Sequence, residues 1–216
     1  MTQLIRRLAK CTSAASAAEM ALVMPLLLLL LFGIIDAGRL MWEFNEAEKA
    51  TQVGARVAIV TNVLSTGLRD ADYEGTTVGS TTIGPGDPIP AGALGTMVCT
   101  STGCTCSVSP CPSVGTFDST TFNNVIVSRM QLIYPAIKAE NVEVRYSGSG
   151  LGFADSSTSV GGGGGATEQM EVSPLVTVRL KDLTFDPVTS LLFASIPMPS
   201  FSTTLTAEDA SGAYSN

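Results

Sequence analysis

The feature that most constrains this chain is an apolar run near its N-terminus, residues 20–35, which contains no charged side chain. As a helix this run would be about 24 Å long, shorter than the roughly 30 Å hydrocarbon core of a bilayer. Extending it back to residue 14, through alanine and serine, gives about 33 Å and includes Glu19. The sequence therefore predicts a transmembrane helix over residues 14–35.

Charge on the two sides of this helix predicts its orientation. Residues 1–13 carry Arg6, Arg7 and Lys10 and no acid, so the positive-inside rule makes them a cytoplasmic leader. Everything after about residue 36 would then lie outside the cytoplasm, in a single-pass protein of the inner (cytoplasmic) membrane. A cleaved signal peptide is the alternative, but Ile35-Asp36-Ala37 lacks the small-x-small pattern of a cleavage site, and the helical pattern continues beyond it. A retained anchor is favoured.

Glu19 is the only charge in the predicted membrane span. A carboxylate within an apolar helix costs a few kcal/mol unless it is paired, protonated or at the lipid headgroups. One interpretation is that Glu19 marks the cytoplasmic edge of the membrane. The other is that it pairs with a cation on another chain or on a processed N-terminus.

The helix is predicted to continue beyond the membrane as a stalk over residues 36–68. No proline occurs from Asp36 to about Leu64, and Gly67 is a plausible stop. Opposite charges at Asp36 and Arg39, and at Glu46 and Lys49, are spaced for i,i+3 pairs. Apolar and small residues recur every three or four positions, at Leu40, Phe44, Ala47, Ala50, Gly54 and Val57. This face would pack either on another helix or on the protein's own head.

Residues 69–216 are predicted to form an α+β head outside the cytoplasm. Asp118 or Ser119 could cap a helix over about 120–133, and a short helix is expected at 188–194. Alternating or β-branched runs predict strands, which we place at residues 142–146, 175–180 and 201–205. Breakers around Gly84-Pro85-Gly86 and a glycine run at 161–165 indicate loops. The expected head is one helix on a small antiparallel sheet.

Four cysteines form a cluster with the spacing C-x4-C-x-C-x4-C, namely Cys99, Cys104, Cys106 and Cys111. Outside the cytoplasm an even cluster usually forms disulfides, and a zinc site is the rival interpretation. Three pairings are open, of which Cys104 with Cys106 is the least favourable because a one-residue gap strains the bridge. We expect two local disulfides and no metal.

Composition argues against most catalytic and nucleic-acid functions. The chain has no histidine, so Ser-His-Asp, Cys-His and histidine-metal sites cannot form. Its net charge of −7 disfavours a nucleic-acid-binding face. The glycine-rich stretches lack the lysine and helix of a phosphate-binding loop. We therefore expect no catalytic residues and no cofactor.

Residues 18–39 resemble the N-terminal signature of the TadE-like proteins of the tight-adherence (Flp) pilus machinery. The resemblance lies in small-Glu-(Met)-Ala-Leu-x-x-Pro, an apolar run and Gly-Ile-Ile-Asp-x-Gly-Arg, followed by a Gly-Ala-Arg stretch. It is carried by Glu19, Pro25, Gly33, Gly38, Arg39 and Arg56. The fold it implies is pilin-like, with a long N-terminal helix and a small head. A glutamate-containing final strand is a habit of the family, and residues 205–208 could be that strand.

By this resemblance, prepilin peptidase would cleave after Ala14 and leave Ala15 with a free ammonium that pairs with Glu19 of a neighbouring subunit. Ala14 stands where glycine is usual, and Met20 stands where related pilins tend to have tyrosine. The implied function is that of a minor pseudopilin or membrane-anchored assembly factor of a tight-adherence pilus or related secretion system. Its partners would be other pilins and inner-membrane pilus assembly proteins, with helix-mediated oligomers. The alternative is a membrane-anchored adhesin or binding module.

Overall fold

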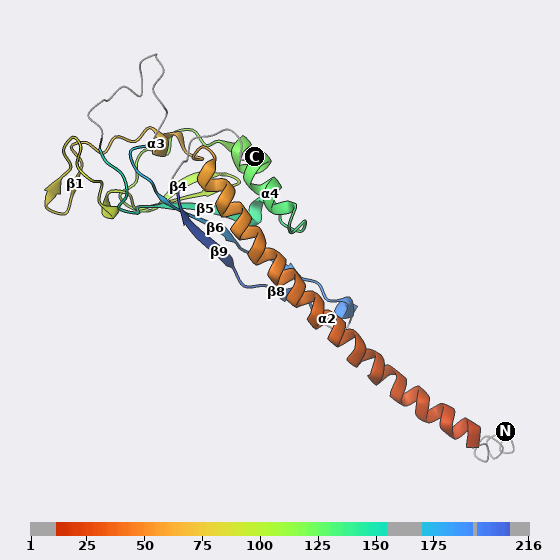
Figure 1. The fold of residues 1–216 in the computed structure, drawn as a ribbon. Helices are drawn as coiled ribbons and strands as arrows, with labels where there is room; N and C mark the ends of the chain where they lie inside the picture. Colours follow the sequence, from red (N-terminus) through yellow and green to blue (C-terminus); the bar gives the residue numbers. More distant parts are fainter. Residues whose placement is uncertain (1–11, 155–169, 192–193, 208–216) are drawn as a thin grey trace. The chain divides into compact units, whose positions relative to one another are not determined.

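The computed structural model describes residues 12–154, 170–191 and 194–207. The chain divides into two compact units, each considered by itself. The first comprises Met1–Glu43 and Thr184–Ile196, and the second comprises Phe44–Leu183 and Pro197–Asn216. Figure 1 shows the long helix α2, which contributes residues to both units, and the strands of the head.

Helix α2 runs without interruption from Thr12 to Val60 and contains Pro25. It ends earlier than the predicted stop near Gly67, because the chain turns to bury Leu64 in the second unit. The Tyr146 hydroxyl accepts a hydrogen bond from the Leu64 backbone N–H at 3.3 Å. Ser65 then caps a separate one-turn helix, α3 (Thr66–Arg69), so residues 61–68 do not continue α2.

The second unit is built on a five-stranded antiparallel sheet with the order β4-β3-β5-β6-β9. The strands are β3 (Thr96–Thr100), β4 (Gly103–Val108), β5 (Val142–Ser147), β6 (Leu175–Leu180) and β9 (Phe201–Thr206). All three strands predicted from the sequence are confirmed as β5, β6 and β9. The sequence analysis missed β3 and β4, the two strands that contain three of the four clustered cysteines.

One face of the sheet is covered by α2 and by the helix predicted over residues 120–133. That helix consists of a π-helical segment, η2 (Thr121–Val127), and α4 (Ser128–Gln131). Asp118 rather than Ser119 caps it, accepting hydrogen bonds from the backbone N–H groups of Thr120 and Thr121 at 3.0 Å each. The side of this helix that faces the sheet is apolar, and its Phe122, Ile126 and Met130 side chains are fully buried.

Residues 44–60 of α2 pack onto this sheet through small side chains. Ala47 and Ala50 are fully buried, and the Thr51 hydroxyl lies 2.9 Å from that of Thr203 on β9. A Cβ added to Gly54 would lie 2.6 Å from the Met130 Sδ atom and 3.2 Å from a Val178 methyl group. Of the two interpretations left open for this face, packing on the protein's own head is therefore the one observed.

The other elements are short. They are the pair β1 (Thr77–Val78) and β2 (Thr81–Thr82), the pair β7 (Thr184–Phe185) and β8 (Ile196–Pro197), and the 3₁₀ turns η1 (Ala91–Ala93), η3 (Ala139–Asn141) and η4 (Val188–Leu191). The helix expected at 188–194 is thus described as far as Leu191. The glycine run 161–165 and Glu208 lie outside the described residues. The α+β fold with a long apolar N-terminal helix is confirmed.

Candidate assembly site on the N-terminal helix

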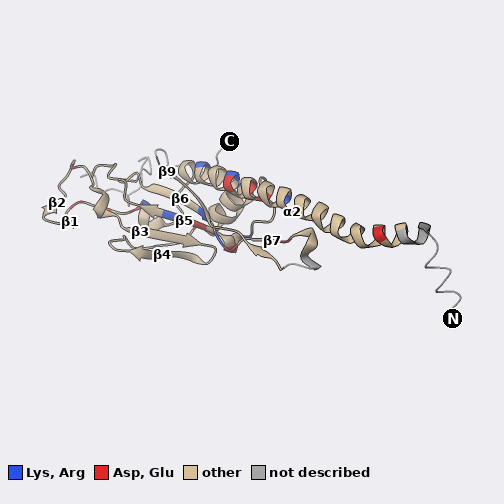
Figure 2. Ribbon diagram, turned by 90° about the horizontal axis from the view of Figure 1, so that it is seen from below, with Lys and Arg blue, Asp and Glu red and all other residues tan. Residues whose placement is uncertain are grey.

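The N-terminal part of α2 exposes apolar side chains all round. Between Glu19 and Asp36 the helix carries no charge, which Figure 2 shows as a tan stretch after the first red residue of α2. Residues 20–35 are all exposed, whereas a helix in a soluble fold buries at least one stripe. This surface therefore requires an apolar environment outside the chain.

Glu19 lies near the beginning of α2 and is exposed. In the part of the chain that the structure describes, its carboxylate has no ion-pair partner. Ala14 and Ala15, the predicted processing positions, lie in the first turn of α2, and the basic leader lies outside the described residues. A cation for Glu19 would have to come from that leader, from a processed N-terminus or from another chain.

Gly33 and Gly38 are not required by close packing against the described residues of this chain, and Pro25 is exposed. A Cβ added to Gly33 or Gly38 would meet no atom within 4 Å. Pro25 lies inside the helix, where it removes one backbone hydrogen bond, yet α2 continues through it. Because the family signature has these residues and the chain's own packing does not explain them, they are candidates for contacts with other molecules.

Asp36 ends the uncharged stretch and binds a distant part of the chain within the first unit. Its Oδ1 atom accepts a hydrogen bond from the Val188 backbone N–H at 2.7 Å. Its Oδ2 atom accepts hydrogen bonds from the Thr189 backbone N–H at 3.1 Å and from the Thr189 hydroxyl at 2.7 Å. Asp36 is 7% exposed. It therefore holds the first turn of η4 against α2, which the sequence analysis did not predict.

Arg39 stands one turn further along α2 and completes this cluster. Its guanidinium lies 3.7 Å from the Asp36 carboxylate and 3.5 Å from that of Glu43. The predicted i,i+3 pair of Asp36 and Arg39 is confirmed. The same guanidinium lies 5.4 Å from the centroid of the Phe185 ring, within cation–π range. A lone acid at the end of an apolar run, followed by arginine, was the only sequence signal of this site.

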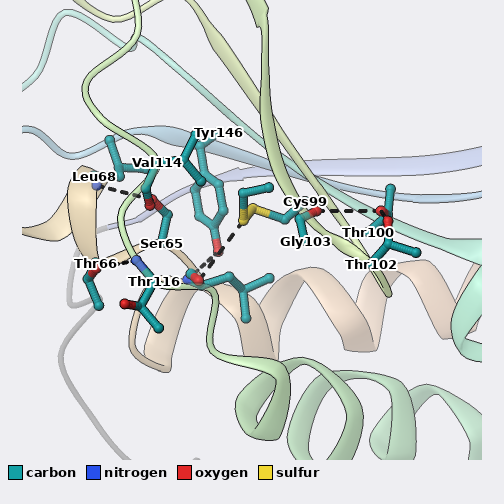
Figure 3. The surroundings of a disulfide bond; sticks show 12 residues. Ser65, Thr66, Leu68, Cys99, Thr100, Thr102, Gly103, Val114, Thr116 and Tyr146 are labelled. Atoms are coloured by element: carbon teal, nitrogen blue, oxygen red, sulfur yellow. Dashed lines mark hydrogen bonds between the residues drawn. A yellow bond between two sulfur atoms is a disulfide. The ribbon is translucent and has the colours of Figure 1, made fainter.

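The four clustered cysteines form two disulfides in the second unit, Cys99–Cys104 and Cys106–Cys111. This confirms the prediction, settles the pairing that was left open and removes these thiols as zinc ligands. Cys99 and Cys104 are opposite each other on β3 and β4, so their bridge joins the edge strand to its neighbour. Figure 3 shows Cys99 beside Tyr146 and the loop that contains Val114.

That loop is joined to the turn after α2. The Ser65 hydroxyl donates to the Val114 carbonyl at 2.6 Å, and the Thr66 backbone N–H donates to the Thr116 carbonyl at 3.1 Å. The approach is close enough that a Cβ on Gly67 would lie 1.7 Å from the Ser113 carbonyl oxygen. The disulfides therefore stabilise a loop that supports the end of α2, which is a structural role.

The carboxylate of Glu143 on β5 is buried, and its environment differs from that of the exposed Glu19. It forms ion pairs with Arg145 and, at 3.2 Å, with the Lys181 ammonium. Burial alone would raise the pKa of the Glu143 carboxyl, but hydrogen bonds and charge from Arg145 and Lys181 outweigh burial. The pKa therefore lies below its ordinary value of 4.5. Since this charge is compensated within the sheet, it needs no external partner.

Among the residues that the structure describes, one helix, α2, is long and apolar enough to cross a membrane, which is consistent with a single-pass membrane protein. Residues 14–56 match the family model of TadE-like proteins, which confirms the resemblance seen in the sequence. No curated protein and no solved structure matches the chain. The match indicates a component related to assembly of the tight-adherence pilus, a structural rather than enzymatic kind of protein that interacts with other pilus assembly proteins.

Proposed function

We propose that this protein is a minor pseudopilin or a membrane-anchored assembly factor of a tight-adherence pilus, with its leader in the cytoplasm and its head outside. The observation that carries the proposal is the position of the family match. It covers residues 14–56, which form most of α2 and include the exposed uncharged stretch, Glu19 and Asp36. The region that the family shares thus includes residues 20–35, the part of the described chain whose surface is least satisfied by its own fold.

Within this proposal Glu19 is the residue that joins subunits. It is the only charge before Asp36 in an apolar helix, and an unpaired carboxylate in a membrane is costly. Cleavage after Ala14 would make Glu19 the fifth residue of the mature chain and leave an ammonium on Ala15 that is free to pair with Glu19 of a neighbour. The pairing would offset the cost and fix the register between helices.

The test is to replace Glu19 by alanine and by glutamine in cells that assemble the pilus. Both variants are expected to insert in the membrane as well as the wild type, because each removes a charge from an apolar segment. Both are expected to lose pilus assembly or association with partner proteins, because each removes the charge that pairs. Membrane fractionation measures insertion, and a piliation assay measures assembly.

Glu48→Gln is the matched control, since Glu48 is also exposed on α2 but lies beyond the uncharged stretch. This variant should assemble normally. If both Glu19 variants also assemble normally, the carboxylate only marks the membrane edge and the proposed role of Glu19 in assembly is wrong. Mass spectrometry of the mature N-terminus shows separately whether Ala15 is the first residue.

A further inference from the structure

We propose that the described parts of the segment from β7 to β8, residues 184–191 and 194–196, are a second membrane contact, which rests in the outer lipid leaflet and is held to the end of the transmembrane helix by Asp36. We call these residues, 184–191 and 194–196, the contact loop. The inference rests on the membrane placement in the proposed function and goes beyond it, because that function requires only the single helix.

The first argument is the position along α2 at which the contact loop is attached, because this position sets the depth of the loop in the membrane. A bilayer core of about 30 Å corresponds to about 20 helical residues. Counted from residue 14, where the predicted span begins, the opposite edge falls near residue 34, just before Asp36. The contact loop is attached at this level, because the amides of Val188 and Thr189 both donate to Asp36. Its attachment point therefore coincides with the lipid–water boundary.

The second argument is the surface that the contact loop presents. Val188 is 56% exposed and Ile196 is 43% exposed. The sequence contains no charged residue from position 187 to position 207. Apolar side chains that are exposed beside a membrane span form one continuous apolar surface with it. Because lipid would cover the uncharged stretch of α2, lipid would also cover this adjoining surface of the contact loop.

The third argument is that the polar groups near the loop's attachment are already satisfied. The Val188 and Thr189 donors go to Asp36, and the Ser195 hydroxyl donates to the Asp186 carboxylate at 2.6 Å. Backbone and hydroxyl groups need such internal partners where water is scarce. Asp36 is itself compensated by these donors and by Arg39, so the cluster can lie at the lipid boundary without an unpaired charge.

A groove between the contact loop and α2 gives the lipid a place to pack. It has a volume of about 480 Å³, and its apolar lining includes Gly33, Ala37 and Leu40 of α2 and Phe185, Pro187 and Ala194 of the loop. Gly33 belongs to the uncharged stretch and leaves open space where a side chain would be. We therefore assign this groove to acyl chains of the outer leaflet.

The test uses fluorescent labels on single cysteines in the full chain, reconstituted in phosphatidylcholine vesicles. Cys11 is first changed to serine, and an environment-sensitive fluorophore is attached at Val188→Cys or Ile196→Cys. Leu132→Cys, at a residue 75% exposed on the head, reports water, and Leu28→Cys, in the uncharged stretch, reports lipid. Nitroxide-labelled lipids quench fluorophores in the membrane, and aqueous iodide quenches those in water.

Labels at 188 and 196 are expected to be quenched by shallow nitroxide lipids and protected from iodide, while the label at 132 shows the reverse. If 188 and 196 are quenched by iodide like 132, while 28 is quenched by lipid, the helix is inserted but the contact loop is not in lipid. That result overturns this inference and leaves the proposed function standing. If 28 is also quenched by iodide, the membrane placement itself fails.

The role of Asp36 is tested by adding Asp36→Ala to the Val188→Cys protein. Loss of the three hydrogen bonds should release the loop, so lipid quenching at 188 falls and iodide quenching rises. Glu43→Ala is the matched control, because it removes a carboxylate that pairs with Arg39 and leaves the three hydrogen bonds of Asp36 to the loop in place. Unchanged lipid quenching at 188 in the Asp36→Ala protein would overturn the holding role. Retention of both disulfides in each variant, measured by thiol counting, shows that the head has folded.

Discussion

The two halves of α2 both contain glycine and apolar residues, but these are explained in different ways. In residues 44–60 the small residues face the sheet, and Gly54 leaves no room for a side chain. In residues 20–38 the glycines face open space, and the apolar side chains are exposed on every side. The C-terminal half of α2 is therefore explained by the chain's own packing. The N-terminal half is not explained by the described residues and requires an apolar environment outside the chain.

The strongest test of this difference is to place the same side chain at a glycine in each half of α2. Gly54→Leu should lower the free energy of unfolding of the head by about 3 kcal/mol, because it overpacks the contact with Met130 and Val178. Gly33→Leu, in the same helix, should leave the unfolding of the head unchanged. Chemical denaturation in detergent, followed by circular dichroism, measures both. Equal effects of the two substitutions would contradict the distinction.

Two carboxylates provide a second comparison. Glu143→Gln should lower the stability of the head by about 2 kcal/mol at pH 7, because it breaks ion pairs with Arg145 and Lys181. Glu19→Gln should not change the stability of the head, because Glu19 lies in the exposed stretch of the other unit.

The effect of Glu143 should also depend on pH, with a defined sign. Its pKa in the folded protein lies below the ordinary value of 4.5, so the unfolded chain takes up a proton first as the pH falls. The stability that Glu143 contributes is therefore complete well above pH 4.5 and is lost below it. The difference between the wild type and Glu143→Gln should shrink as the pH is lowered through this range. A difference that grew on acidification would show that the pKa shift has the opposite sign.

The smallest effect is expected where the two halves of α2 meet. The Phe44 ring lies edge-on to the Phe201 ring, with 4.7 Å between centroids. A double-mutant cycle with Phe44→Ala and Phe201→Ala should give a coupling of about 1 kcal/mol, as for other edge-to-face pairs. A coupling near zero would mean that packing on the sheet begins only further along α2, toward Ala47.

The sequence predicted what depends on short-range pattern. Alternation identified β5 and β6, a capping aspartate identified the helix after Asp118, and the uncharged run identified the apolar helix. It did not predict β3 and β4, because glycine and cysteine obscured the alternation there. It could not predict that Asp36 binds residue 188, since nothing local to either segment specifies a partner so far away.

The other parts of the candidate site divide in the same way. The signature around Glu19 could be recognised from the sequence, and the family match confirms it. The residue at which α2 ends could not be predicted from the sequence. Its end is set by the burial of Leu64 and by the hydrogen bond to Tyr146, both of which depend on the finished head. Long-range packing thus fixed what local periodicity left open.

The binding of Asp36 to the contact loop has a consequence for how the protein is made. Asp36 leaves the ribosome before its partners, which follow 152 and 153 residues later in the chain. At about 5–20 residues per second, synthesis of that interval takes roughly 8–30 s. Throughout this period the uncharged stretch of α2 has been synthesised while Asp36 still lacks its hydrogen-bond donors. Completion of the first unit is therefore one of the last steps of synthesis, and a chain truncated before residue 188 would have an unfinished first unit as well as an incomplete head.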